Sequence, residues 1–219
     1  MVEKLKEAIM ATDASYVVLD IDGTIKDLVK EHQTALQVVV NGFNRGKKLR
    51  RKFVFFLDRI AMWFVKSGIL STNRDRQEFL LGLYAIILGK SISEFRELYD
   101  SFYNDKSITF KGVREFIEEV GKTKKVCFVT INSQNYNIIE KLGIKKEDIY
   151  CVKSKKKIYA YKTVMMMNDL DPEEMLVVGD NIFDDIRPAK KLGCSYLLVD
   201  NYKSKFKRFL AKLFKVGIV

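Results

Sequence analysis

The chain has very few of the residues that build catalytic triads, disulfides and zinc sites: its 219 residues include one histidine, three cysteines and two prolines. The single histidine, His32, nearly excludes triads and histidine-based metal clusters, and we expect it at the surface. The cysteines lack metal-binding spacing, and Cys127 and Cys151 fall within apolar strand runs, where a free thiol behaves as a small hydrophobic side chain. A reducing, cytoplasmic location is therefore expected. No uncharged stretch is long enough to span a bilayer, and the N-terminus predicts a helix rather than a signal peptide.

The net charge of +11 comes from two short segments. Residues 45–52 and residues 203–215 each carry six basic side chains and no acidic one, so together they account for the whole excess. Basic patches favour an anionic partner, which here means a phosphorylated substrate, nucleic acid or an acidic membrane surface. The alternative is that both segments form a solvated face that keeps the protein soluble.

The strongest chemical signal is a pair of carboxylates at the end of an apolar run. Residues 16–19 predict a buried parallel strand, and Asp20 and Asp22 follow before Gly23 ends it. Side chains two residues apart on a strand point the same way, so both carboxylates can address one volume at the edge of a sheet. One can attack an electrophile while the other moves a proton. The alternative is a strand that runs into an Asp-Gly turn.

A second acidic cluster follows another apolar strand far downstream. Residues 175–179 predict this strand, and Asp180, Asp184 and Asp185 come directly after it. Carboxylates from two strand ends supply the oxygen ligands that Mg²⁺ prefers. The two clusters together therefore predict one metal-assisted site.

Two further elements lie between the acidic clusters. Residues 126–129 predict a strand that ends in the hydroxyl of Thr130. A lysine-rich stretch follows at 153–157, with Lys162 beyond it. One of these lysines can serve a phosphate site, whereas most of them are typical of a solvated basic face.

In this order, the segments resemble the motifs of the haloacid dehalogenase (HAD) superfamily, and specifically its phosphatases. The motifs are D-x-D-G-T at 20–24, the strand-terminal Thr130, a lysine ahead of a helix, and G-D-x-x-x-x-D at 179–185. The likeness covers residues 14–24 and about 108–200. It implies a three-layer Rossmann-like α/β core with a parallel sheet, interrupted by an inserted all-helical cap of the C1 type.

The resemblance implies a covalent mechanism. Asp20 would be the nucleophile that forms an aspartyl-phosphate, and Asp22 the general acid and base. Thr130 would bind the transferring phosphoryl oxygens, and Lys157 would neutralise charge between Asp20 and the phosphate. Spacing ahead of the last motif favours Lys157 among the lysines. The alternatives that stay open are Lys155, Lys156 and Lys162.

The resemblance also implies Mg²⁺ as the cofactor. Its site would use the carboxylates of Asp20 and Asp180, the carbonyl of Asp22, and either Asp184 or Asp185, of which the spacing to the following motif residues favours Asp185. Asn132 is a further candidate on the substrate side, although Ile131 separates it from Thr130, whereas the family often has asparagine directly after the threonine.

These features predict a Mg²⁺-dependent phosphomonoester hydrolase that acts on a small phosphorylated substrate. The acid at Asp22 is typical of the superfamily's phosphatases and phosphomutases, so a phosphomutase is the alternative enzyme. A catalytically idle binding protein that uses the basic patches for nucleic acid or an anionic membrane is the alternative from another class. No motif identifies the substrate.

The domain organisation follows from periodicity. Residues 1–24 and 108–200 predict the catalytic core, in which strands alternate with helices, and residues 25–107 show helical apolar stripes that predict the cap. The stretch 53–64 is apolar on more than one side. We expect a helix sandwiched inside the cap there, with an apolar wall facing the active site or a partner as the alternative.

Residues 201–219 predict a basic amphipathic C-terminal helix. Its apolar side chains fall at helical spacing, and basic ones occupy most of the remaining positions. We expect the apolar stripe to pack on the core with the lysines in solvent, and attachment to an anionic membrane is the alternative. The stripe consists of Phe206, Phe209, Leu210, Leu213 and Phe214.

Overall fold

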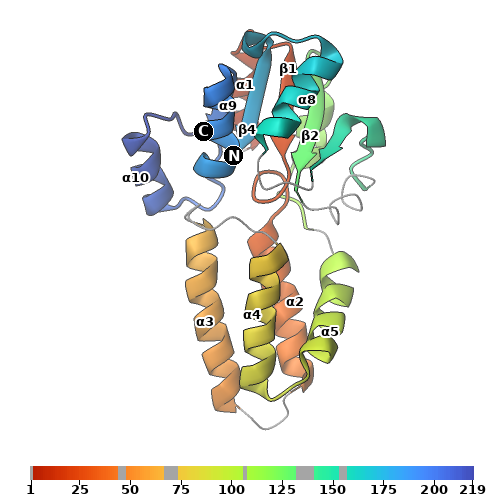
Figure 1. Ribbon diagram of the computed structural model, residues 1–219, viewed down its shortest axis with the longest axis vertical. Coiled ribbons are helices and arrows are strands. Elements are labelled where there is room, and N and C mark those ends of the chain that lie inside the picture. Colours follow the sequence, from red (N-terminus) through yellow and green to blue (C-terminus); the bar gives the residue numbers. More distant parts are fainter. Residues whose placement is uncertain (1, 44–47, 67–73, 106–107, 132–140, 153–156) are drawn as a thin grey trace. The chain divides into compact units, whose positions relative to one another are not determined.

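The computed structural model describes six segments, residues 2–43, 48–66, 74–105, 108–131, 141–152 and 157–219. The chain forms two compact units (Figure 1). We call Met1–Asp27 together with Thr109–Val219 the sheet unit, and Leu28–Ile108 the helical unit. Three of the candidate residues, Asn132, Lys155 and Lys156, lie outside the described residues.

The sheet unit contains a five-stranded sheet in the order β3-β2-β1-β4-β5, and every pair of neighbouring strands is parallel. This confirms the predicted α/β fold class. Because β1 is central, the residues that follow β2 and β4 flank the end of β1. The strands are β1 (Tyr16–Asp20), β2 (Lys125–Thr130), β3 (Ile149–Cys151), β4 (Met175–Gly179) and β5 (Ser195–Leu198).

Helices cover both faces of this sheet, because alternate residues of each strand point to opposite sides. Val17 and Leu19 of β1 pack against α1 and α6. Tyr16 and Val18 pack on the other face, against α8 and α9. Asp20 continues the second series, so its side chain is directed to the α8 side. The helices are α1 (Val2–Met10), α6 (Val113–Val120), α8 (Ile158–Asn168) and α9 (Arg187–Leu192).

Short helical turns connect several of these elements. A π-helical turn, Ile182–Ile186, leads from β4 into α9, and Asn181 caps it by accepting hydrogen bonds from the backbone N–H groups of Phe183 and Asp184. Two 3₁₀ turns, Lys146–Asp148 and Pro172–Glu174, precede β3 and β4.

The C-terminal helix α10 (Lys205–Leu213) also belongs to the sheet unit. Its Leu210 and Ala211, with Phe214 beyond its end, pack on the π-helical turn and on Leu198 of β5. The predicted stripe is only partly right, since Phe209 and Leu213 are exposed. The expectation that the lysines lie in solvent is wrong for Lys207, which is fully buried.

In the residues that the structure describes, the helical unit has four helices around an apolar core that includes Leu36, Val54, Tyr84 and Phe95, one from each helix. His32 is buried in this unit: its ring nitrogens lie 2.6 Å from the Tyr99 hydroxyl and 2.7 Å from Asp58 Oδ1. The expected surface position of this histidine is therefore wrong, because two polar partners compensate its burial. The helices are α2 (Leu28–Phe43), α3 (Lys48–Lys66), α4 (Arg74–Leu88) and α5 (Ile92–Asp105).

Helix α3 differs from its prediction. The face of α3 that carries Val54, Asp58 and Ala61 is buried within the helical unit. Phe56 and Trp63 lie on the opposite side of the helix and are more than half exposed. A helix buried on all sides is thus incorrect for this segment. In the parts of the chain that the structure describes, no helix has the length and hydrophobicity needed to cross a bilayer.

Candidate active site

Asp20 stands at the carboxyl end of the central strand and is almost fully buried. The Thr24 hydroxyl donates a hydrogen bond to Asp20 Oδ2 at 3.0 Å. The Lys157 ammonium, one residue before α8, pairs with Asp20 Oδ1. Because each oxygen has its own partner, the carboxylate is held in one orientation.

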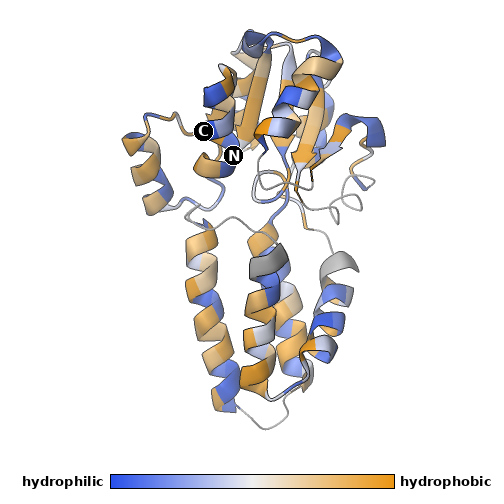
Figure 2. Ribbon diagram, viewed as in Figure 1, coloured by the Kyte–Doolittle hydropathy of each residue, from blue (hydrophilic) through white to orange (hydrophobic). Residues whose placement is uncertain are grey.

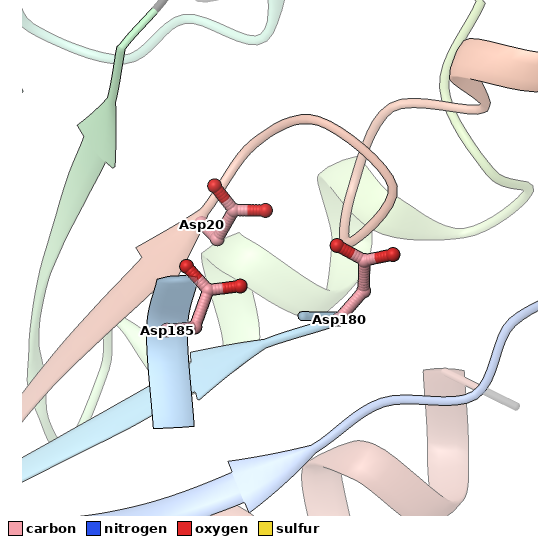
Figure 3. Close-up of side chains that lie close together, drawn as sticks. All are labelled: Asp20, Asp180 and Asp185. Atoms are coloured by element: carbon pink, nitrogen blue, oxygen red, sulfur yellow. The ribbon is translucent and has the colours of Figure 1, made fainter. Parts of the chain in front are cut away.

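Two more carboxylates meet Asp20 at the end of β4 (Figure 3). Asp180 is the first residue after the strand, and Asp185 is in the π-helical turn. Asp185 is completely buried, and its Oδ2 accepts a 3.0 Å hydrogen bond from the backbone N–H of Asn181. Asp184 does not belong to this cluster of Asp20, Asp180 and Asp185. Of the two candidates for the last metal ligand, the geometry therefore favours Asp185.

Two glycines make room for these acids. A Cβ on Gly179 would lie 2.5 Å from the Asp185 side chain, well inside any normal contact. A Cβ on Gly23 would lie 2.6 Å from Asp180 Oδ2, and Gly23 also has φ +85°, in the left-handed region that favours glycine. The glycines of both predicted motifs thus let the acidic side chains approach the backbone.

The structure distinguishes among the candidate lysines that it describes. Lys157 is buried, and besides Asp20 it contacts Asp185 Oδ1 at 2.5 Å, so it bridges the two acidic motifs. Lys162 is exposed on α8. The buried Tyr161 hydroxyl lies 3.5 Å from the same Asp185 oxygen, a contact that the sequence did not suggest.

Burial and neighbouring charges both shift the pKa values of the site residues. Burial raises the pKa of Asp20 well above its usual range, and the carboxylates of Asp185 and Asp180 act in the same direction, whereas Lys157 opposes them. Burial alone would lower the pKa of Lys157, but Asp185 and Asp20 raise it well above its ordinary value, so this side chain stays an ammonium. A cation bound among these three side chains would oppose the rise, because it favours their ionised forms.

Lys207 is a further residue that the sequence did not suggest for this site. This fully buried lysine of α10 places its ammonium 3.2 Å from Asp180 Oδ2. Burial raises the pKa of Asp180, and Lys207 opposes that effect. The sequence does contain a signal for its burial. Helical spacing puts Lys207 on the same face of α10 as the apolar residues Leu210, Ala211 and Phe214.

Asp22 and Thr130 complete the described candidates. The Asp22 carboxylate is largely buried and lies 3.8 Å from the ammonium of the buried Lys26, a partner that the sequence did not suggest. Thr130 is buried at the end of β2, one residue beyond the residue that pairs with Asp20. The structure thus brings both residues to the carboxyl edge of the sheet where Asp20 lies.

The acidic cluster fits a divalent cation. Asp20, Asp180 and Asp185 each have an oxygen within 4.8 Å of the corresponding oxygens of the other two. Such hard oxygen donors suit Mg²⁺ better than a softer metal. These three side chains would hold the ion.

Solved structures share this fold at low sequence identity. A candidate HAD hydrolase from Bacillus subtilis, YfnB, described with bound magnesium, is 14% identical with TM-score 0.65, covering 93% of this chain and 99% of its own. A protein from Haemophilus somnus, described as a predicted phosphoglycolate phosphatase, is 15% identical with TM-score 0.62 and the same coverage. A candidate β-phosphoglucomutase from Thermotoga maritima is 20% identical with TM-score 0.61, covering 93% and 100%.

No curated protein sequence matches the chain. The model of the haloacid dehalogenase-like hydrolase family, in contrast, matches residues 17–199, which include every described acid of the site. That match spans most of the chain, and it begins in β1 and ends just after β5. The chain therefore belongs to the haloacid dehalogenase-like hydrolases.

Proposed function

We propose that this hydrolase is a Mg²⁺-dependent phosphomonoesterase that acts through an aspartyl-phosphate on Asp20. The observation that carries the proposal is the bridge made by Lys157, which pairs with both Asp20 and Asp185. This bridge puts an ammonium group beside the proposed nucleophile, where the charge of a phosphoryl group must be neutralised.

The reaction would proceed in two steps. A carboxylate oxygen of Asp20 attacks phosphorus, the bond from phosphorus to the alcohol oxygen breaks, and Asp22 gives its proton to the leaving oxygen. Water then attacks the phosphorus of the aspartyl-phosphate and gives its proton to Asp22. The bond from phosphorus to the Asp20 oxygen breaks, which restores the carboxylate and releases inorganic phosphate. The Thr130 hydroxyl donates a hydrogen bond to a phosphoryl oxygen. When bound, Mg²⁺ would offset the repulsion among the carboxylates and the phosphoryl oxygens.

Two further expectations rest on this proposal. The helical unit would act as the cap that excludes water and selects the substrate, as expected for an insertion between the first two motifs. The substrate would be a small phosphorylated molecule.

Hydrolysis of an aryl phosphate by the full chain tests the proposal. Asp20→Asn should abolish phosphate release, and a chelator should do the same until Mg²⁺ is restored. Asp184→Asn is the matched control, since Asp184 is an acid of the same turn outside the cluster, and it should retain turnover. Unchanged activity of Asp20→Asn would exclude the covalent mechanism. A phosphorylated sugar that isomerises without releasing phosphate would point to the phosphomutase instead.

A further inference from the structure

Helix α3 of the helical unit has an outward face with an unusual composition. Five large apolar side chains follow one another at alternating spacings of four and three residues, which keeps them on one side of the helix. They stay between 43% and 81% exposed. We call them the apolar row: Leu49, Phe53, Phe56, Ile60 and Trp63.

The apolar row is continuous along most of α3. At 1.5 Å per residue it extends roughly 21 Å. Figure 2 shows hydrophobic residues along most of the length of this helix. Isolated exposed apolar side chains are ordinary, but a contiguous row of this size usually marks an interaction surface.

The charge around the apolar row has one sign. Asp58 is the single acidic residue in α3, and it is buried against His32. Four basic residues follow one another at helical spacing along one flank of the apolar row. We call them the basic row: Lys48, Lys52, Arg59 and Lys66.

Two hollows meet at this flank. A groove of about 500 Å³ is lined by apolar-row side chains and by Ile87 of α4. A pocket of about 640 Å³ between α2 and α3 is lined by amide side chains of α2, including Gln33 and Gln37, and by Asp58 and Arg59 of α3. Lys52 and Phe56 line both hollows. The apolar groove thus adjoins a polar pocket, and the cation Lys52 lies where the two meet.

We propose that α3 binds in the plane of an anionic phospholipid membrane, with the apolar row in the boundary between headgroups and acyl chains and the basic row against lipid phosphates. An amphipathic helix with aromatic residues on one side and lysine or arginine beside them is suited to this position. Each cation near such a surface strengthens binding roughly fivefold.

The composition of this face argues against a second copy of the chain and against nucleic acid as its binding partner. An isologous contact with a second copy of the chain would bring two sets of cations together, because Asp58, the single acidic residue of α3, is buried and paired with His32. Nucleic acid would be attracted by the basic row but would leave most of the apolar row in water. An anionic bilayer can bury the apolar row and bind the basic row through its phosphates at the same time.

The single tryptophan of the chain supplies a direct probe, since Trp63 belongs to the apolar row. The full-length protein should float with phosphatidylcholine vesicles that contain phosphatidylserine, and not with phosphatidylcholine alone. Binding should weaken as salt rises. Tryptophan emission should shift to shorter wavelength, and brominated acyl chains should quench it. Failure to float at low salt would overturn the proposal.

Matched variants locate the surface. Phe53→Ser with Phe56→Ser should reduce vesicle binding at least tenfold, and Lys52→Gln with Arg59→Gln should reduce it roughly 25-fold from the two lost charges. Both pairs change exposed positions, so the melting temperature should be preserved. Phe209→Ser with Leu213→Ser removes the exposed apolar side chains of α10, the other basic helix, and should have little effect.

The remaining outcomes contradict the proposal. Binding lost only in the α10 variant would place the membrane contact on that helix. A doubled mass without lipid, abolished by the Phe53 and Phe56 changes, would make the face a dimer interface. Equal affinity for vesicles and for an oligonucleotide of matched charge would show that the basic row binds any polyanion and that the apolar row contributes nothing.

Discussion

The ammonium of Lys207 lies 3.2 Å from Oδ2 of Asp180, so the C-terminal helix α10 reaches an acid of the candidate metal site. Lys207 is fully buried, and the Asp180 side chain is only 15% exposed. This contact couples the stability of α10 to the charge of the site, because a buried carboxylate without its cation is costly.

Lys207→Met should therefore destabilise the metal-free protein by about 3–5 kcal/mol, since Asp180 would lose its ammonium partner while remaining near other carboxylates. Mg²⁺ should recover part of that loss, giving a larger metal-induced rise in melting temperature than in the wild type. Scanning calorimetry with and without Mg²⁺ measures both effects. The control Lys212→Met, exposed on the same helix, should change neither, and equal effects from the two variants would contradict the coupling.

Lys157→Ala should lower the rate of aryl phosphate hydrolysis about a hundredfold or more, because it removes the cation shared by Asp20 and Asp185. Lys162→Ala, on the exposed side of α8, should retain full turnover. Steady-state kinetics compares the two variants. If Lys162→Ala proves the more damaging change, Lys157 is not the phosphate-site lysine.

Gly179→Ala should impair metal binding, because the new Cβ would lie 2.5 Å from the Asp185 side chain and force it away. Calorimetric titration with Mg²⁺ should show weaker binding even where the variant remains folded. Gly42→Ala in α2 has no atom within 4 Å of the new Cβ, so it should be neutral or stabilising by about 0.5–1 kcal/mol. Unchanged Mg²⁺ affinity in Gly179→Ala would remove Asp185 from the metal site.

Asp22→Asn should slow the hydrolysis of alkyl phosphates more than that of activated aryl phosphates, because only the poorer leaving group needs a proton. The ratio of kcat/KM values for the two substrates measures this effect. A ratio identical to that of the wild type would show that Asp22 is not the general acid.

The thiols provide a test that depends on pH. Burial raises the pKa of Cys127 from its ordinary 9.0 to about 12, and that of Cys194 to about 11. A raised thiol pKa leaves less thiolate at a given pH, so at pH 8 Cys127 should hold about a thousandfold less of the reactive form than an unperturbed thiol. Iodoacetamide followed by mass spectrometry should label the half-buried Cys151 first. Rapid labelling of Cys127 would show that β2 opens.

The sequence alone determined the parallel sheet and the polar residues at the carboxyl ends of its three central strands. Apolar runs that end in Asp20, Thr130 and Asp180 are local signals, and parallel strands align their carboxyl ends whatever the rest of the chain does. The family match agrees with that prediction. The same local spacing favoured Lys157 and Asp185, and the structure places both side chains beside Asp20, whereas Lys155 and Lys156 lie outside the described residues.

Only the tertiary structure decided which side chains are buried. His32 and Lys207 look like surface residues in sequence, yet each is buried because a distant segment supplies a polar partner, Asp58 for one and Asp180 for the other. Periodicity shows that a helix has an apolar stripe but not which face its neighbours cover. For α3 the packed face proved to be that of Val54, Asp58 and Ala61, and the larger apolar side chains stayed outside, because burial is a property of the assembled helices and not of any one of them.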